Sequence, residues 1–318
     1  SSRKVQKKPR HSKGQYFNSD QVLAQHGKSF YWARFFLGKE PSQKATHLYG
    51  FCRYLDDIAD SQEKDRLEKL LQIKKTINQI DELNNLPPEI ATFLKLNDGN
   101  RSGILSANDL LEGLISDQDD VLITDEEELI QYSYQVAGSV GLMMAPILKA
   151  KNKKSFPFAI DLGIAMQLTN IARDVKEDAI YGRRYIPGIL CNSMTPDEIF
   201  VSANGDDPQG REAIKKSINH VLTIAEKYYN SGLSGLTYLP IRNHIAIGIA
   251  AIIYRQIGRK LMKSGTQWWQ GREIVSFTEK FIYSFFIITT LFSRLKSYPS
   301  HNKSLHFHLK KFQNINES

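Results

Sequence analysis

Two pairs of aspartates, Asp56 with Asp60 and Asp174 with Asp178, are the residues of this sequence best suited to do chemistry. The two members of each pair are four residues apart, in a proline-free stretch rich in apolar residues. Residues four apart lie on one face of a helix, so each pair would place two carboxylates side by side. Adjacent carboxylates repel each other unless a hard cation neutralises them. Two facing pairs would therefore bind Mg²⁺ together with a diphosphate.

Further polar side chains share the face of the second pair. Gln167 and Asn170 precede Asp174 and Asp178 at helical spacing, on a predicted helix over residues 167–178 that is otherwise largely apolar. The alternative is a solvated polar face, because Asp and Asn usually face water. The presence of a second aspartate pair more than a hundred residues away favours a binding site.

Two arginines next to the aspartates would add positive charge. Arg53 precedes Asp56 by one helical turn, and Arg173 is adjacent to Asp174. A guanidinium group binds phosphate oxygens with two parallel hydrogen bonds. Both positions therefore favour a diphosphate as the ligand.

Three blocks of the sequence resemble the squalene and phytoene synthase family. The blocks are residues 26–31 with 49–60, residues 132–141, and residues 162–178 with 183–187, which include the runs Leu-Asp-Asp-Ile-Ala-Asp and Asn-Ile-Ala-Arg-Asp-Val-Lys-Glu-Asp. The resemblance implies an all-α fold, a single-domain helical bundle of the isoprenoid-synthase type. Its two Asp-rich helices would face each other across a central apolar cavity.

The resemblance also implies an activity, the Mg²⁺-dependent head-to-head condensation of two prenyl diphosphates through a cyclopropyl diphosphate. Residues 51–60 and 182–187 look closer to bacterial phytoene synthases, so we expect phytoene from two geranylgeranyl diphosphates, as in carotenoid biosynthesis. The alternative is a squalene or dehydrosqualene synthase that uses two farnesyl diphosphates, with NADPH needed for squalene. A bulky Arg34 at the cavity floor would favour that shorter substrate. An alternative of a different class is a non-catalytic, membrane-associated assembly factor of the same fold. Such a protein would be expected to have lost some of the aspartates, whereas all four are present here.

Individual roles follow from the resemblance. Mg²⁺, or Mn²⁺ in its place, would be held by Asp56, Asp60, Asn170, Asp174 and Asp178. The catalytic set adds Arg53 and Tyr132 to the four aspartates. Substrate binding is expected from His26, Lys28, Ser29, Phe30, Gln167, Asn170, Arg183, Tyr185 and Tyr254.

The elements between these blocks are expected to be helical, with few loops. We predict helices from Glu40 through the first aspartate pair and over residues 62–83, 211–232, 240–263 and 272–297, the last of them buried or in contact with lipid. A short helix is also expected to begin at Asn108. The small residues at 136–141 would let another helix or a ligand approach the backbone. Residues 183–185 would fold over the site as a flap, and the acidic run at 116–120 reads as a solvated turn.

Composition limits the class of protein. With 41% apolar residues in 318, the chain can bury a sizeable core. Its two cysteines, Cys52 and Cys191, give no disulfide framework, which suits a reducing compartment. We find no Cys/His cluster with zinc spacing, and His306 and His308 fall in a polar C-terminal stretch. The longest apolar runs are shorter than a transmembrane helix requires.

The net charge of +8 is concentrated near the two ends of the chain. We expect a disordered basic tail at residues 1–14, a prenyl-synthase domain at 15–298 and a polar tail at 299–318. The basic tail is either merely solvated or attracted to an anionic membrane. No basic face with interleaved aromatics suggests a nucleic-acid partner. We expect a monomer or weak dimer in the cytoplasm, in peripheral contact with a membrane. Location in an organelle is the alternative, because the chain begins with Ser-Ser rather than Met and its native N-terminus need not be present.

Overall fold

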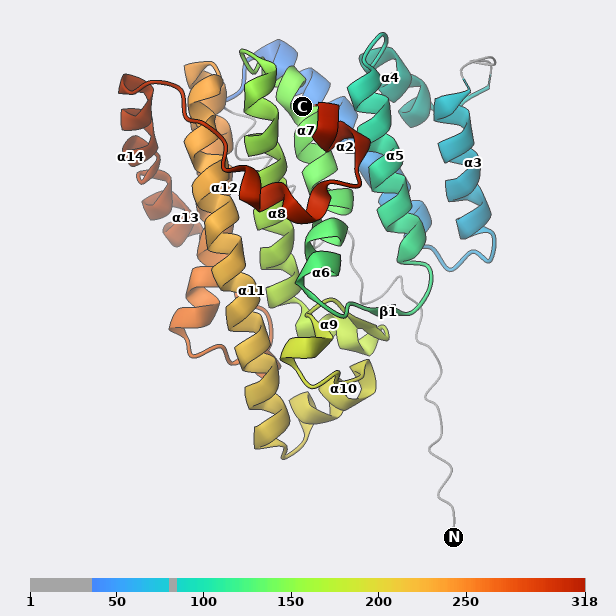
Figure 1. Cartoon of the computed structure of the whole chain (residues 1–318), viewed down its shortest axis with the longest axis vertical. Coiled ribbons are helices and arrows are strands. Elements are labelled where there is room, and N and C mark those ends of the chain that lie inside the picture. Colours follow the sequence, from blue (N-terminus) through green and yellow to red (C-terminus); the bar gives the residue numbers. More distant parts are fainter. Residues whose placement is uncertain (1–35, 80–84, 318) are drawn as a thin grey trace.

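Helix α8 (Phe156–Arg173) runs through the middle of the molecule and packs against several other helices (Figure 1). Its neighbours are α7 (Ser139–Ile147), α11 (Pro208–Ser234) and α12 (Ile241–Lys263). This computed structural model describes residues 36–79 and 85–317. Within those ranges the chain is mainly helical with almost no strand, which confirms the predicted fold class.

Glycines bring α8 close to α7 and to the residues just before it. A Cβ atom on Gly141 would lie 2.3 Å from the carbonyl oxygen of Ala159, and one on Gly163 would lie 2.4 Å from that of Ala137. Side chains at these positions would force the helices apart. The close approach expected from the small residues at 136–141 is therefore confirmed, as a contact between two helices.

The segment that leads into α7 is not a regular α-helix. Between α6 (Glu126–Ser133) and α7, the residues of η2 (Tyr134–Gly138) form a turn of π-helix. The sequence pattern gave no indication of this change in winding. Turns of π-helix are rare and often lie at functional sites.

The first aspartate pair lies at the C-terminal end of α2 (Lys39–Ala59). Leu48, Phe51 and Leu55 recur at intervals of three and four residues and are fully buried, so they anchor the helix in the core. Asp56 lies in the last turn of α2, and Asp60 is the residue that ends it, with its N–H donating to the carbonyl of Asp56 at 2.9 Å. The predicted helix is confirmed.

The second aspartate pair spans a break that the sequence pattern did not predict. The expected continuous helix is divided at Asp174, where α8 ends and α9 (Val175–Ile180) begins. The backbone N–H of Asp174 still donates to the backbone carbonyl of Asn170 at 2.9 Å, and the N–H of Asp178 donates to the carbonyl of Asp174 at 2.8 Å. These two bonds keep the side chains one turn apart, so the predicted polar stripe survives the break.

The remaining helices form the outer parts of the bundle. The sequence placed an outer helix over residues 62–83 and a short helix starting at Asn108, whereas the observed helices begin at Arg66 and Arg101. Asn100 caps the second of these, because its side chain accepts a hydrogen bond from the N–H of Gly103. The bounds are α3 (Arg66–Asn78), α4 (Pro88–Leu96), α5 (Arg101–Ser116) and α10 (Pro196–Asn204).

Two very short strands join parts of the chain that are far apart in sequence. β1 (Val121–Leu122) pairs in parallel with β2 (Arg183–Arg184), with Val121 opposite Arg183. The pairing continues where the N–H of Ile123 donates to the carbonyl of Arg184 at 3.0 Å. The loop after α5 is thereby fixed against the segment that follows the second aspartate pair.

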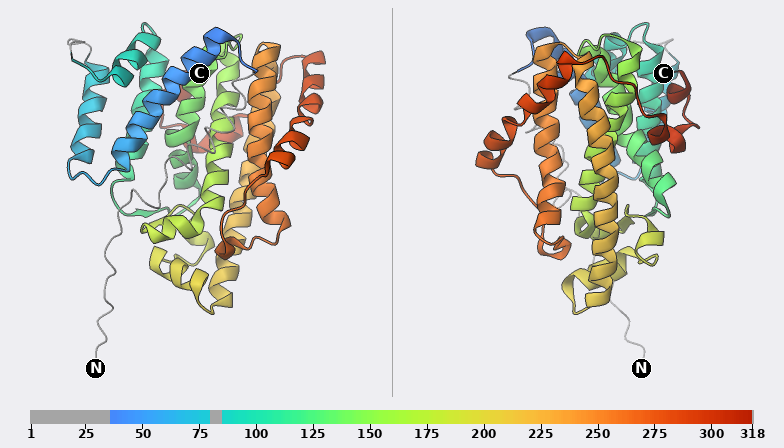
Figure 2. Two further views of the ribbon diagram at one scale, coloured as in Figure 1. Left: turned by 180° about the vertical axis from the view of Figure 1, so that it is seen from behind. Right: turned by 60° about the vertical axis from the view of Figure 1, so that its left-hand side comes forward.

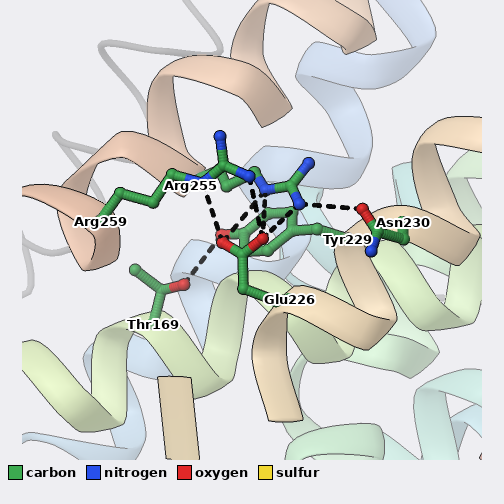
Figure 3. Close-up of polar contacts among 6 residues, drawn as sticks. All are labelled: Thr169, Glu226, Tyr229, Asn230, Arg255 and Arg259. Atoms are coloured by element: carbon green, nitrogen blue, oxygen red, sulfur yellow. Dashed lines mark hydrogen bonds and ion pairs between the residues drawn. The ribbon is translucent and has the colours of Figure 1, made fainter. Parts of the chain in front are cut away.

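A cluster of polar contacts holds α8, α11 and α12 together (Figure 3). Glu226 on α11 accepts hydrogen bonds from Arg255 and from Arg259 on α12, the latter through Nε and a terminal nitrogen at 3.0 Å each. The hydroxyl groups of Thr169 on α8 and Tyr229 on α11 lie 2.8 Å apart. Burial disfavours the charge of Glu226, yet the bonds from the arginines outweigh it and lower its pKa to about 2.

The C-terminal part of the chain departs from the expected single helix over 272–297. It forms α13 (Phe277–Ser284), α14 (Ile287–Leu291) and the 3-10 helix η7 (Phe292–Leu295), which lie against α12 at the edge of the bundle (Figure 2). Ile287 is the one residue of these three elements that is buried. The segment is therefore mostly exposed rather than buried.

Residues 299–317 fold back along the bundle instead of projecting as a polar tail. They contain the 3-10 helix η8 (Lys303–Leu309) and α15 (Gln313–Glu317). Leu309 and Phe312 join the largest buried cluster of apolar side chains.

Other 3-10 turns are η3 (Lys153–Ser155), η4 (Gly188–Leu190), η5 (Gly235–Tyr238) and η6 (Trp268–Gln270). No helix of the described ranges combines the length and hydrophobicity needed to cross a membrane.

Candidate active site

The two aspartate pairs meet in one cavity of about 410 Å³. This volume is typical of a pocket for a small ligand. Its apolar wall comes chiefly from α7, α8, η5 and α12 and includes Leu148, Phe158, Leu162, Met166, Leu236 and Leu239. Its polar residues are Asp56, Asp60, Asp117, Tyr132, Gln167, Asn170, Asp174, Asp178, Arg183 and Tyr185. The cavity thus combines a cluster of acids with a largely apolar lining.

One carboxyl of each pair, Asp56 and Asp178, has a raised pKa. Burial is the largest cause that raises the pKa of Asp56 well above its ordinary value, and the charge of neighbouring Asp60 is the next largest. Burial and the charge of Asp174 do the same to Asp178. Bringing these carboxylates together in the charged form therefore costs free energy, which a bound cation would offset.

Asp117 is a site residue that the sequence analysis missed. The acidic run at 116–120 was expected to be a solvated turn, and Asp119 and Asp120 are indeed exposed. Asp117 instead lines the cavity, and its Oδ2 accepts a hydrogen bond from the hydroxyl of Tyr132 at 2.8 Å. Burial raises its pKa to about 6 although Arg183 opposes the shift. Within the described part of the chain, its Oδ1 has no hydrogen-bond partner.

Arg183 lies between the two aspartate pairs. Its charge lowers the pKa of Asp178. Burial lowers the pKa of Arg183 itself, but neighbouring groups that include Asp60 and Asp117 raise it, so Arg183 stays charged. A terminal nitrogen of Arg183 donates to the backbone carbonyl of Asp117 at 3.3 Å. Pairing of β1 with β2 produces this arrangement, since it places the two loops side by side.

The expected flap divides into two parts with different environments. Tyr185 lines the cavity beside Arg183 and stacks on Tyr132, with ring centroids 4.9 Å apart. Arg184 points away from the cavity and donates to the carbonyls of Ile123, Ile186 and Met194 at 2.7–3.2 Å. Arg184 therefore holds the loop in place and is not positioned to meet a ligand.

Asn170 and Gln167 line the cavity next to the second aspartate pair. Nδ2 of Asn170 donates to Oε1 of Gln167 at 3.3 Å, and the hydroxyl of Tyr254 donates to Oδ1 of Asn170. Tyr254 is fully buried behind Asn170 and is not one of the lining residues. The structure thus shows Tyr254 in contact with a lining side chain, and its contact with substrate stays a prediction.

The two arginines expected to bind phosphate are placed differently. Arg173 is buried and forms two hydrogen bonds with Asp174, Nε to Oδ1 at 2.7 Å and a terminal nitrogen to Oδ2 at 2.9 Å. Arg272, from the loop before α13, adds an ion pair to Oδ1 of Asp174 at 3.1 Å. Arg53 is half exposed on α2, 3.9 Å from Asp57, and is not part of the cavity wall.

Five residues named from the sequence lie outside the described residues. They are His26, Lys28, Ser29, Phe30 and Arg34. Their roles stay predictions, as does the basic tail at residues 1–14. The described residues nevertheless supply acids, amides and one arginine in a single cavity.

The donor set of the cavity fits Mg²⁺. Carboxylate and amide oxygens are the ligands that this ion takes, and it keeps open positions for water and phosphate. Oδ1 of Asp117 has no hydrogen-bond partner among residues 36–79 and 85–317, and the pKa values of Asp56 and Asp178 are raised. Both features are expected of acids arranged for a cation. Cys52 also lines the cavity, but burial raises the pKa of its thiol and makes it a poor nucleophile.

Comparisons with known proteins agree with this geometry. Residues 23–279 match the sequence model of the squalene/phytoene synthase family. The chain is 33% identical to a 15-cis-phytoene synthase of Enterobacter agglomerans, over 80% of this chain and 88% of that one. It is 33% identical to a phytoene synthase of Thermus thermophilus, over 77% and 82% of the two chains. A crystal structure of a dehydrosqualene synthase with ligand is similar at a TM-score of 0.72, with 26% identity over 86% of this chain and 95% of that one.

Proposed function

Because the chain belongs to the squalene/phytoene synthase family of prenyl transferases, we propose that it condenses two geranylgeranyl diphosphates head to head into phytoene. The observation that supports this best is the meeting of two aspartate pairs in one apolar cavity. A non-catalytic assembly factor would need neither the acids nor the cavity. The relatives named phytoene synthase support the choice of product.

The acids and Asn170 would hold Mg²⁺, which as a Lewis acid would neutralise the leaving diphosphate. Arg183, between the two pairs, would donate hydrogen bonds to the diphosphate oxygens. Tyr132 and Tyr185 would offer aromatic faces to an allylic cation. Tyr254 would hold the amide of Asn170 in one orientation through its hydrogen bond.

The apolar wall would protect the reaction from water. Leu162, Met166 and Leu236 surround the space next to the acids and would exclude the solvent that quenches a carbocation. From the family resemblance, the second substrate's double bond would attack the cation left by the departing diphosphate. Loss of a proton from the resulting cation would close the ring of a cyclopropyl diphosphate. A second ionisation and rearrangement, ended by proton loss, would then give phytoene without a nicotinamide.

The similarity to a dehydrosqualene synthase favours a second candidate, condensation of two farnesyl diphosphates to a thirty-carbon product. Incubation of the purified protein with each diphosphate and Mg²⁺, followed by mass analysis of the hydrocarbons, tests both. We expect forty-carbon phytoene, none of it in excess chelator, and no requirement for NADPH. Only thirty-carbon product, or product only with NADPH, would reject phytoene in favour of the second candidate.

We further propose that α13, α14 and η7 form the contact with a membrane, which supplies the apolar substrate and takes up the product. Phe277, Phe281, Phe285 and Phe292 are more than half exposed there, and Leu295 is 85% exposed. Such a concentration of exposed apolar residues is unusual on a water-exposed surface. The chain would then be a monomer or weak dimer attached peripherally, with no membrane-spanning helix required.

A further inference from the structure

Three side chains outside the cavity have the residue types of a metal site. Asp161 lies on α8, and His301 and His306 come from the C-terminal segment that folds back along the bundle. Nε2 of His301 lies 2.7 Å from Oδ2 of Asp161, and Nε2 of His306 lies 2.6 Å from its Oδ1. One donor atom from each residue lies within 4.8 Å of those of the other two.

The cluster is buried and contains a charge. Asp161 has no exposed surface, and the side chains of His301 and His306 are 10% and 9% exposed. Each carboxylate oxygen of Asp161 lies within hydrogen-bond distance of one imidazole nitrogen, so both oxygens face the two histidines. A buried carboxylate needs a cation beside it, and a metal ion is one of the two usual partners.

We propose that Asp161, His301 and His306 bind a divalent transition-metal ion, with Zn²⁺ the best match. Two histidines with four residues between them have the spacing found in zinc sites, and Zn²⁺ combines imidazole nitrogen with carboxylate oxygen. Tetrahedral ligands of zinc lie about 3.3 Å apart. The side chains would separate slightly from their present hydrogen-bonded arrangement to admit the ion, and the histidines would be neutral.

The residues around the cluster suit this coordination. The hydroxyl of Ser231 on α11 donates to Oδ2 of Asp161 at 2.5 Å and would orient the carboxylate. A water molecule would complete a tetrahedron. Both histidines lie after residue 279, where the match to the family ends, so the site would be an addition to the family's machinery.

The ion would fasten the C-terminal segment to the back of the cavity wall. The ring of His301 lies edge-on to Phe158, a lining residue, with centroids 5.3 Å apart. The hydroxyls of Tyr228 and Tyr238 donate to the carbonyls of Leu305 and Pro299 at 2.7 and 2.9 Å, and these two residues are close in sequence to His306 and His301. A link between residues 140 positions apart would stabilise the fold by restricting the unfolded chain.

Metal analysis of the untagged full chain, purified without chelator, tests the proposal. We expect one equivalent of Zn²⁺ per chain in the wild type, or uptake of one equivalent when Zn²⁺ is titrated into stripped protein. His306→Gln should lose this equivalent, whereas His308→Gln, in the same 3-10 helix, should keep it. Co²⁺ in place of Zn²⁺ should give the visible absorption of a tetrahedral site in the wild type and not in His306→Gln.

Mg²⁺-dependent pyrophosphate binding should persist in His306→Gln, because the aspartate pairs belong to a different site. A wild-type chain that takes up no Zn²⁺ would overturn the proposal whatever the variants do. So would retention of the equivalent by folded His306→Gln. Either result would make the three residues a hydrogen-bonded cluster only.

Discussion

At the scale of single residues, the aspartates should make the metal-free protein less stable as the pH rises. Asp56 and Asp178 have pKa values raised in the folded state, so the folded chain binds more protons than the unfolded chain above about pH 4. The free energy of unfolding should then fall as pH rises through the raised values. Asp56→Asn removes one of these acids and should raise the melting temperature of metal-free protein at pH 8 more than at pH 5.

Thermal melting in chelator at both pH values measures this effect. The matched control is Asp57→Asn, an exposed neighbour on the same helix. Equal shifts for the two variants would mean that Asp56 carries no unusual cost of ionisation. Asp117, with a pKa raised to about 6, should contribute to the same trend.

At the scale of elements, the stability of the contact between α11 and α12 should depend on the ion pairs of Glu226. Its pKa is lowered to about 2, so its stabilising contribution is present above the ordinary value near 4.5 and is lost as pH falls through about 2. Glu226→Gln should cost about 2 kcal/mol at pH 7, because two arginines lose their charged acceptor. Chemical denaturation measures this cost. Glu212→Gln, exposed on the same helix, should cost little, and an equal loss would contradict the assigned role.

The elements also show what a sequence can predict about such a site. The aspartate pairs follow from local spacing, since residues four apart share a helical face whatever the rest of the chain does. Asp117 could not be predicted in this way, because its position depends on pairing between β1 and β2, which are some sixty residues apart in sequence. The turn of π-helix at η2 and the break at Asp174 likewise depend on packing against neighbouring helices. His301 and His306 are informative only once Asp161 is beside them.

At the scale of the whole molecule, the apolar face of α13, α14 and η7 should determine membrane binding. Replacing Phe281 and Phe285 with serine should reduce co-sedimentation with lipid vesicles, because the membrane would bury less apolar surface. Each Å² of apolar surface removed from water contributes about 25 cal/mol to binding. Turnover of substrate dissolved in detergent should be unaffected. Phe200→Ser, an exposed phenylalanine on α10, is the control. Equal sedimentation of all three proteins would place the membrane contact elsewhere.

The central claim is that the two aspartate pairs form one site for Mg²⁺ and diphosphate. Calorimetric titration with pyrophosphate, in Mg²⁺ and in chelator, tests it most directly. Since the acids repel each other without metal and the metal lacks ligands without phosphate, we predict strongly tighter binding in Mg²⁺. Asp60→Asn and Asp178→Asn, one from each pair, should each abolish most of that gain. Equal affinity in chelator, or a gain that survives loss of either pair, would contradict the account.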